Sequence, residues 1–112
     1  MKKEITLTPA TPEQHVSLSV GDSLTVVADP DGWSKAQWDP MSIKAASHML
    51  KRGFWTSQKG AKVRKRFAAT HPGGPTKLAV TFFLDADPKL PLAERVARSK
   101  SQIVVLNVTV VA

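Results

Sequence analysis

Four aspartates stand in two Asp-x-Asp pairs, Asp29 with Asp31 and Asp85 with Asp87. Clustered carboxylate oxygens are the ligands that a hard cation such as calcium prefers, so the four could form a cation site if their loops converged. Each pair also adjoins a proline, and aspartate in such a setting commonly accepts hydrogen bonds from the backbone of its own turn. The turn interpretation is the simpler one, and we expect no bound metal and no other cofactor.

The chain has no sequence signature of catalysis. Its three histidines, His15, His48 and His71, lie far apart, and none has a second metal ligand at the usual spacing. The chain contains no cysteine, which excludes disulfides, thiolate nucleophiles and zinc sites built on cysteine. It also lacks the Gly-x-Ser-x-Gly turn of serine hydrolases and the glycine-rich loop that holds phosphates. We therefore expect a protein that is not an enzyme.

Positive charge is concentrated in the middle of the chain. The net charge is +7, and no acidic residue lies between Asp39 and Asp85. The lysines and arginines in that interval are Lys44, Lys51, Arg52, Lys59, Lys62, Arg64, Lys65, Arg66 and Lys77. A charge segregated in this way creates a local field that attracts anionic partners.

Part of this segment predicts a row of cations. In a strand, Lys62, Arg64 and Arg66 share one face with a spacing of about 6.6–6.8 Å. The residues that could bind a polyanion, either nucleic acid or an anionic glycan, are Lys51, Arg52, Trp55, Lys62, Arg64 and Arg66. The alternative is a solvated edge strand whose charges, with Lys65 pointing inward, prevent aggregation. The sequence favours the edge strand, and salt-dependent binding would separate the two interpretations.

Alternating apolar and polar residues predict β-strands through most of the chain. The predicted strands are 16–20, 24–28, 35–39, 54–56, 62–68, 76–85 and 103–111. A turn at Gly21-Asp22 joins the first two of them. The last strand is apolar on both faces, which indicates either a central strand or a strand that is covered by a partner.

One short helix is predicted within the β pattern. Asp39 is a good N-cap, Pro40 suits the first helical turn, and Gly53 can end the segment. Apolar residues at helical spacing favour a helix over residues 41–50, and the alternative for this alanine-rich segment is an extended conformation.

About seven or eight short strands with regular turns predict one domain, residues 1–112, with a mostly β, antiparallel, immunoglobulin-like sandwich fold. The connection 86–100 would add one or two amphipathic turns through Leu92, Val96 and Ala97. The longest apolar run, Ile103 to Leu106, is too short to span a membrane. The first residues do not form a signal sequence, so we expect a cytoplasmic protein or an exported one whose leader has been removed.

The sandwich fold would gather two loops at one end of the molecule. The loops after the second and the sixth strand of an immunoglobulin-like sandwich lie at the same end. Trp33 follows a turn glycine there, and it either anchors a partner protein or folds back onto the core. The residues expected to contact a partner are Asp31, Gly32, Trp33, Asp85 and Asp87.

Three segments follow the predicted strands in an order that occurs in a known family. The first is Asp29-Pro30-Asp31-Gly32-Trp33 with Trp38 beyond it, the second runs from Gly60 to Gly73, and the third runs from Phe82 to Pro88. The opening segment, Val16 to Val26, resembles the one with which bacterial immunoglobulin-like domains often begin. More narrowly, residues 15–111 resemble chagasin-type cysteine-peptidase inhibitors.

The resemblance implies a specific activity. The chagasin-type family carries an Asn-Pro-Thr-Thr-Gly-Tyr loop, a glycine-rich loop and a Tyr-x-Arg-Pro-Trp loop, which enter the cleft of a papain-type peptidase. This chain shares the order of strands and loops but has neither the Thr-Thr-Gly-Tyr sequence, nor the double glycine before the fifth strand, nor the Arg-Pro-Trp sequence.

The sequence as a whole predicts a non-enzymatic module that recognises another macromolecule, most simply a protein. One alternative is a chagasin-like cysteine-peptidase inhibitor with divergent loops. The other is a domain that binds nucleic acid or an anionic glycan through the basic segment.

Overall fold

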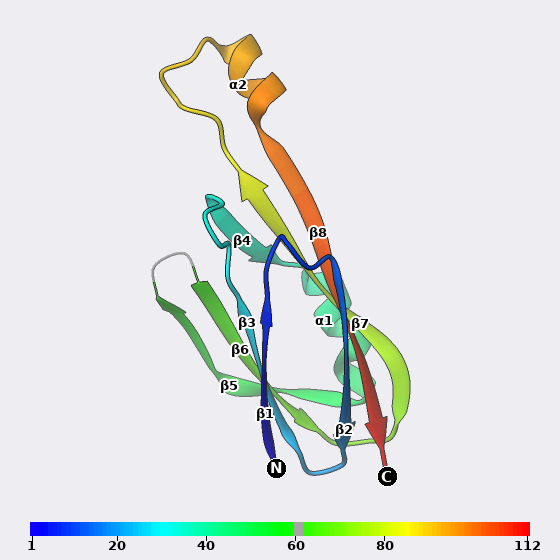
Figure 1. Cartoon of the computed structure of the whole chain (residues 1–112). Coiled ribbons are helices and arrows are strands. Elements are labelled where there is room, and N and C mark those ends of the chain that lie inside the picture. Colours follow the sequence, from blue (N-terminus) through cyan, green and yellow to red (C-terminus); the bar gives the residue numbers. More distant parts are fainter. Residues whose placement is uncertain (60–61) are drawn as a thin grey trace.

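The structure is a computed structural model that describes residues 1–59 and 62–112, with the backbone alone over residues 54–59. Two four-stranded sheets form a sandwich (Figure 1). Sheet A has the order β1 (Lys2–Leu7), β3 (Ser23–Ala28), β6 (Lys62–Ala69), β5 (Leu50–Lys59). Sheet B has the order β2 (Glu13–Ser19), β8 (Lys100–Val111), β7 (Gly73–Leu84), β4 (Lys35–Trp38). The predicted mostly β sandwich is confirmed.

The first three strands alternate between the two sheets. β1 pairs with β3 in parallel, and β2 pairs with β8 in parallel, while the remaining strand pairs are antiparallel. The chain crosses from β2 to β3 through Gly21, which has a φ of 97°. The predicted strands 16–20 and 24–28 therefore do follow one another, but they lie in different sheets. β1 was not predicted, because it contributes only Ile5 and Leu7 to the apolar pattern.

The core lies between the sheets and is built from every second residue of the strands. Phe67 of sheet A and Phe82 of sheet B are 1% and 0% exposed. β8 is a central strand, as one alternative predicted, and its buried inner face consists of Val104, Leu106, Val108 and Val110. Burying each such side chain contributes about 1.5–3 kcal/mol, so a one-residue slip of register would lose most of this core.

The predicted helix begins where the sequence indicated and ends earlier. α1 spans Pro40–Ala45, with the Asp39 carboxylate accepting a hydrogen bond from the Met41 amide at 2.9 Å. A 3-10 turn, Ala46–His48, follows, and β5 begins at Leu50. The Met49 carbonyl accepts hydrogen bonds from the amide and the hydroxyl of Thr70, at 2.8 and 3.0 Å. These bonds hold the chain extended for pairing with β6, so the helix cannot continue to residue 50.

β6 is an interior strand of sheet A, and its predicted position at an edge is wrong. β3 pairs with one side of β6 and β5 pairs with the other, so β6 has a hydrogen-bonded strand on each side. The reason is that β5 runs for ten residues, Leu50–Lys59, where the sequence indicated a strand only over 54–56. The predicted inward direction of Lys65 is correct, since its ammonium lies 5.6 Å from the centre of the Trp38 ring.

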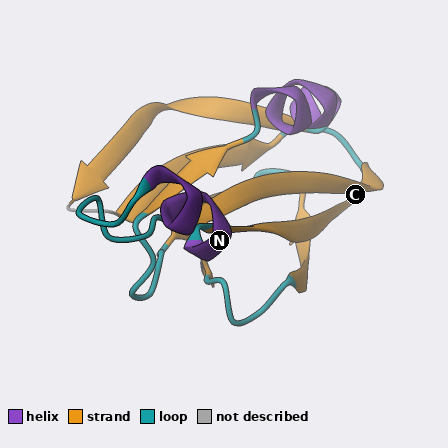
Figure 2. Ribbon diagram, turned by 90° about the horizontal axis from the view of Figure 1, so that it is seen from above, coloured by secondary structure: helices purple, strands orange, loops and turns teal. Residues whose placement is uncertain are grey.

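The molecule is elongated, with principal extents of 54 × 24 × 21 Å. β7 and β8 run beyond the other strands and carry a connection that contains α2 (Leu92–Arg98) at the far end (Figure 1). Figure 2 shows that α1 and α2 lie in different parts of the molecule. Among the described residues, no helix combines the length and apolarity that crossing a membrane requires.

Candidate functional site

Two loops meet at one end of the sandwich, as the fold prediction required. We call this surface the loop end; it consists of residues 29–34, between β3 and β4, and residues 85–99, between β7 and β8. The Ser34 amide donates to the Phe83 carbonyl at 2.8 Å, and the Asp85 amide donates to the Ser34 hydroxyl at 2.8 Å. These two bonds tie the loops together, so residues far apart in the sequence can contact one partner.

The paired aspartates mainly stabilise their own turns. The Asp29 carboxylate accepts from the Asp31 amide at 3.0 Å, and the Asp87 carboxylate accepts from the Lys89 amide at 2.9 Å. Asp31 itself has a φ of 48°, the left-handed conformation that aspartate tolerates in tight turns. Within residues 1–59 and 62–112, no group of three or more acidic, histidine or cysteine side chains is placed to hold a metal ion.

Trp33 packs partly against the core, which corresponds to the second of its two predicted roles. Its amide donates to the Pro30 carbonyl at 3.0 Å, which closes the turn containing Asp31 and Gly32. The side chain is half-buried, so it packs against the core and is also partly exposed. Trp33 therefore positions the loop as well as contributing to its surface.

The most exposed apolar surface at the loop end belongs to α2. Leu92 and Val96 are 67% and 69% exposed, and α2 buries none of its residues. They border a hollow of about 600 Å³ that is lined by Asp85, Ala86, Pro88, Leu92, Arg95, Val96 and Ser99. The Ser99 hydroxyl accepts from the Ala86 amide at 3.3 Å and donates to the Arg95 carbonyl at 2.7 Å, which joins α2 to the strand end. The sequence showed the helical spacing of Leu92 and Val96 but not their exposure.

The predicted polyanion residues divide between two faces of sheet A. Arg64 and Arg66 are paired with Val27 and Thr25, on the outer face, and Lys51 is paired with Ala68 on the same face. Arg52 is paired with Phe67, whose side chain enters the core, and it lines a groove beside α1. Arg52 therefore lies on the opposite face of sheet A from Lys51, Arg64 and Arg66. The Trp55 side chain, and Gly60 and Ala61, lie outside the described residues.

Among the side chains that the structure describes, two ionisable groups have perturbed pKa values. A hydrogen bond from the Ser19 amide, and a second from the N-terminal ammonium, lower the pKa of Asp22. Burial against the core, and then the charge of Arg52, lower the pKa of Lys65. Neither group belongs to the loop end, and both act on the stability of the fold.

Comparison with known proteins finds distant likenesses among solved structures. No family model matches the chain, and no curated protein matches it. The crystal structure of EhICP2, a cysteine protease inhibitor from Entamoeba histolytica, aligns over 96% of each chain with 10% identity and a TM-score of 0.42. The solution structure of amebosin aligns over 93% of this chain and 96% of its own, with 14% identity and a TM-score of 0.31. Likenesses this distant assign no function to the chain.

Proposed function

We propose that the protein is a non-enzymatic recognition module that binds another protein through its loop end. The observation that supports this most directly is the exposure of Leu92 and Val96, at 67% and 69%, on a projection beyond the sandwich. Binding of a partner that covers this water-exposed apolar pair is favourable, because apolar surface is removed from water. Loops held on a rigid β scaffold are the usual location of such contacts.

The partner class that we propose is a papain-type cysteine peptidase. The connections β3–β4, β5–β6 and β7–β8 follow the order in which chagasin-type inhibitors present their three loops to a peptidase cleft, and this order supports the proposal. Because the family's loop sequences are missing, the contacts would come from Trp33, Leu92 and Val96 instead. The acidic residues Asp31, Asp85 and Asp87 would then form the polar rim of the contact.

Inhibition of papain by the full chain tests this proposal. We expect inhibition in the nanomolar range, and we expect Leu92→Gln with Val96→Gln to weaken it by about tenfold or more, because buried apolar anchors dominate such interfaces. The matched control is Met41→Gln with Val111→Gln, which removes two exposed apolar side chains away from the loop end. This control should inhibit like the unmodified chain.

Two results would reject the proposal. Absence of inhibition at micromolar protein would remove cysteine peptidases as the partner class. Equal weakening in the loop-end variant and in the control would show that the inhibition does not come from the loop end. Thermal unfolding of each variant must match that of the unmodified chain, so that misfolding is not mistaken for lost binding.

A further inference from the structure

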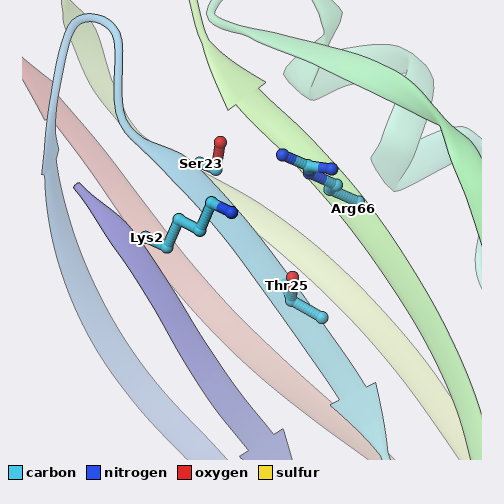
Figure 3. A pocket seen from close by; sticks show the side chains of 4 residues that line it. All are labelled: Lys2, Ser23, Thr25 and Arg66. Carbon is cyan, nitrogen blue, oxygen red and sulfur yellow. The ribbon is translucent and has the colours of Figure 1, made fainter.

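The outer face of sheet A contains a hollow that is unrelated to the loop end. It is shallow, has a volume of about 440 Å³, and is lined by Lys2, Ser23, Thr25 and Arg66 (Figure 3). Lys2 comes from β1, the two hydroxyl residues come from β3, and Arg66 comes from β6. In Figure 3 the Lys2 side chain extends from β1 toward Ser23 and Thr25 on β3, and Arg66 lies on the other side of β3.

Strand register explains why these four side chains meet. Lys2 is paired with Ser23, and Thr25 is paired with Arg66, so the four occupy adjacent cross-strand rows on one face. Neighbouring strands lie about 4.8 Å apart, which separates the backbones of β1 and β6 by roughly 10 Å. The long side chains of lysine and arginine can both reach a group that sits above β3.

The two cations that line the hollow have no ion-pair partner among the described residues. Within the described part of the chain, Lys2 and Arg66 form no ion pair, whereas Lys62 lies 3.6 Å from the Asp29 carboxylate. Arg64 extends the positive charge along β6, and Lys51 occupies the same cross-strand row as Lys2. One carboxylate, Glu4, is paired with Thr25 and borders the hollow, so it is the local opposing charge.

The chemistry of the hollow suits a tetrahedral oxyanion. A guanidinium offers two parallel N–H donors to phosphate or sulfate oxygens, and an ammonium adds a second charge. The hydroxyls of Ser23 and Thr25 can donate to the remaining oxygens. We propose that the outer face of sheet A binds a sulfated glycan, with one sulfate group between Lys2 and Arg66 and the next beside Arg64.

The described side chains of the outer face favour a glycan over a nucleic acid. Single-stranded nucleic acid is normally held by aromatic rings on which its bases stack. The described side chains of the outer face are Lys2, Glu4, Thr6, Ser23, Thr25, Val27, Lys51, Lys62, Arg64, Arg66 and Ala68, and none of them is aromatic. The described part of this surface thus supplies cations and hydroxyls, which match sulfate groups and sugar hydroxyls.

An NMR titration of the labelled full chain with a heparin-derived hexasaccharide tests the proposal. We expect amide shifts in residues 2–6, 23–27 and 64–68, and we expect them to weaken as salt rises. Lys2→Gln with Arg66→Gln should weaken binding by about tenfold or more, since both charge-assisted contacts are lost. The control, Lys77→Gln with Arg98→Gln, removes the same charge from sheet B and α2 and should weaken binding by less than about twofold.

Three further measurements test the site, and the first of them separates a built site from a merely charged surface. Ser23→Ala with Thr25→Val keeps every charge and should still weaken binding by about threefold or more, because two donors are lost. Glu4→Gln removes the opposing carboxylate and should tighten binding. A desulfated hexasaccharide of the same backbone should produce no shifts in these strands.

Several outcomes would overturn the proposal. These are absence of shifts at low salt, equal losses in the site variant and the charge control, and unchanged binding by the hydroxyl variant. A single-stranded oligonucleotide that binds the same amides more tightly than the hexasaccharide would replace the glycan by a nucleic acid. The dispersed amide spectrum of each variant reports directly whether its fold is intact.

Discussion

Lys65 is a cation on the inner side of an interior strand. Its ammonium lies 5.6 Å from the centre of the buried Trp38 ring, which attracts positive charge, while burial and the nearby Arg52 lower its pKa. Burial and repulsion by Arg52 disfavour the charged form of Lys65, whereas the ring favours it. We expect burial and repulsion to dominate, so that the charged form of Lys65 destabilises the folded state.

Substitution of Lys65 by methionine should stabilise the protein at neutral pH. Because the pKa of Lys65 is lower in the folded state than the reference value of 10.5, the unfolded state binds more protons between these two values. The stability of the unmodified protein should therefore rise as pH increases through that window. Urea unfolding of Lys65→Met should show a higher midpoint at pH 7 and a smaller advantage near pH 10.

The exposed Lys77 supplies the control for this experiment, as Lys77→Met removes a lysine from the solvent-facing side of β7. Its effect should be the same at both pH values. A stability difference for Lys65→Met that is constant with pH, or a loss of stability at pH 7, would mean that the contact with Trp38 dominates.

At the scale of elements, the start of β7 depends on a close approach between backbones. Gly74 has a φ of 106°, and a Cβ atom at this position would lie 2.6 Å from the Val108 carbonyl oxygen of β8. The side chain of Met49 lies on the same side, 3.3 Å away. The register shift between Gly73 and Thr76 thus seats the buried Met49 against the β7–β8 pair.

Gly74→Ala should lower the free energy of unfolding by about 2–4 kcal/mol, as it adds a backbone clash to the cost of a left-handed conformation. Gly21→Ala is the matched control, because Gly21 has a φ of 97° and no atom within 4 Å of an added Cβ. Gly21→Ala should lower the free energy of unfolding by about 1 kcal/mol. Equal midpoint shifts for the two variants in urea unfolding would show that the contact with Val108 does not matter.

At the scale of the whole molecule, the described buried residues are distributed unevenly along the 54 Å long axis. The sandwich contains the whole buried cluster, while α2 at the far end buries no residue. Segments with few buried apolar contacts open locally at low free energy. The loop end therefore combines an anchored base, held by the bonds of Ser34, with an outer part that a partner could reorganise.

Hydrogen exchange should show that α2 opens more readily than the strands of the sandwich. Amides of residues 92–98 should exchange orders of magnitude faster than those of residues 104–110, which lie in the central strand of sheet B. The control is α1, a helix of similar length that packs against β7 through the bond from the Ala79 amide to the Ser42 hydroxyl at 3.1 Å. Protection of α2 equal to that of β8 would contradict the assignment of α2 as a loosely held projection.

The sequence by itself determined the strands of the core and the start of the helix. Alternating residues such as Leu78, Val80 and Phe82 indicate a strand because the period of two is local, and Asp39 with Pro40 indicates a helix start for the same reason. The basic row on β6 also followed from this period. The two Asp-x-Asp pairs indicated turns, and hydrogen bonds from turn amides to Asp29 and Asp87 account for them.

Only the tertiary structure decided which strands are neighbours and which faces their charges occupy. Lys51 and Arg52 lie on opposite faces because they are adjacent in β5, whereas no local pattern encodes the register shift between Arg52 and Thr56. Pairing of β1 with β3 brings Lys2 to the row of Ser23, although these residues are distant in the sequence. Such pairings depend on the competition of all strands for non-local hydrogen bonds and burial, so the hollow of sheet A could not be read from the chain alone.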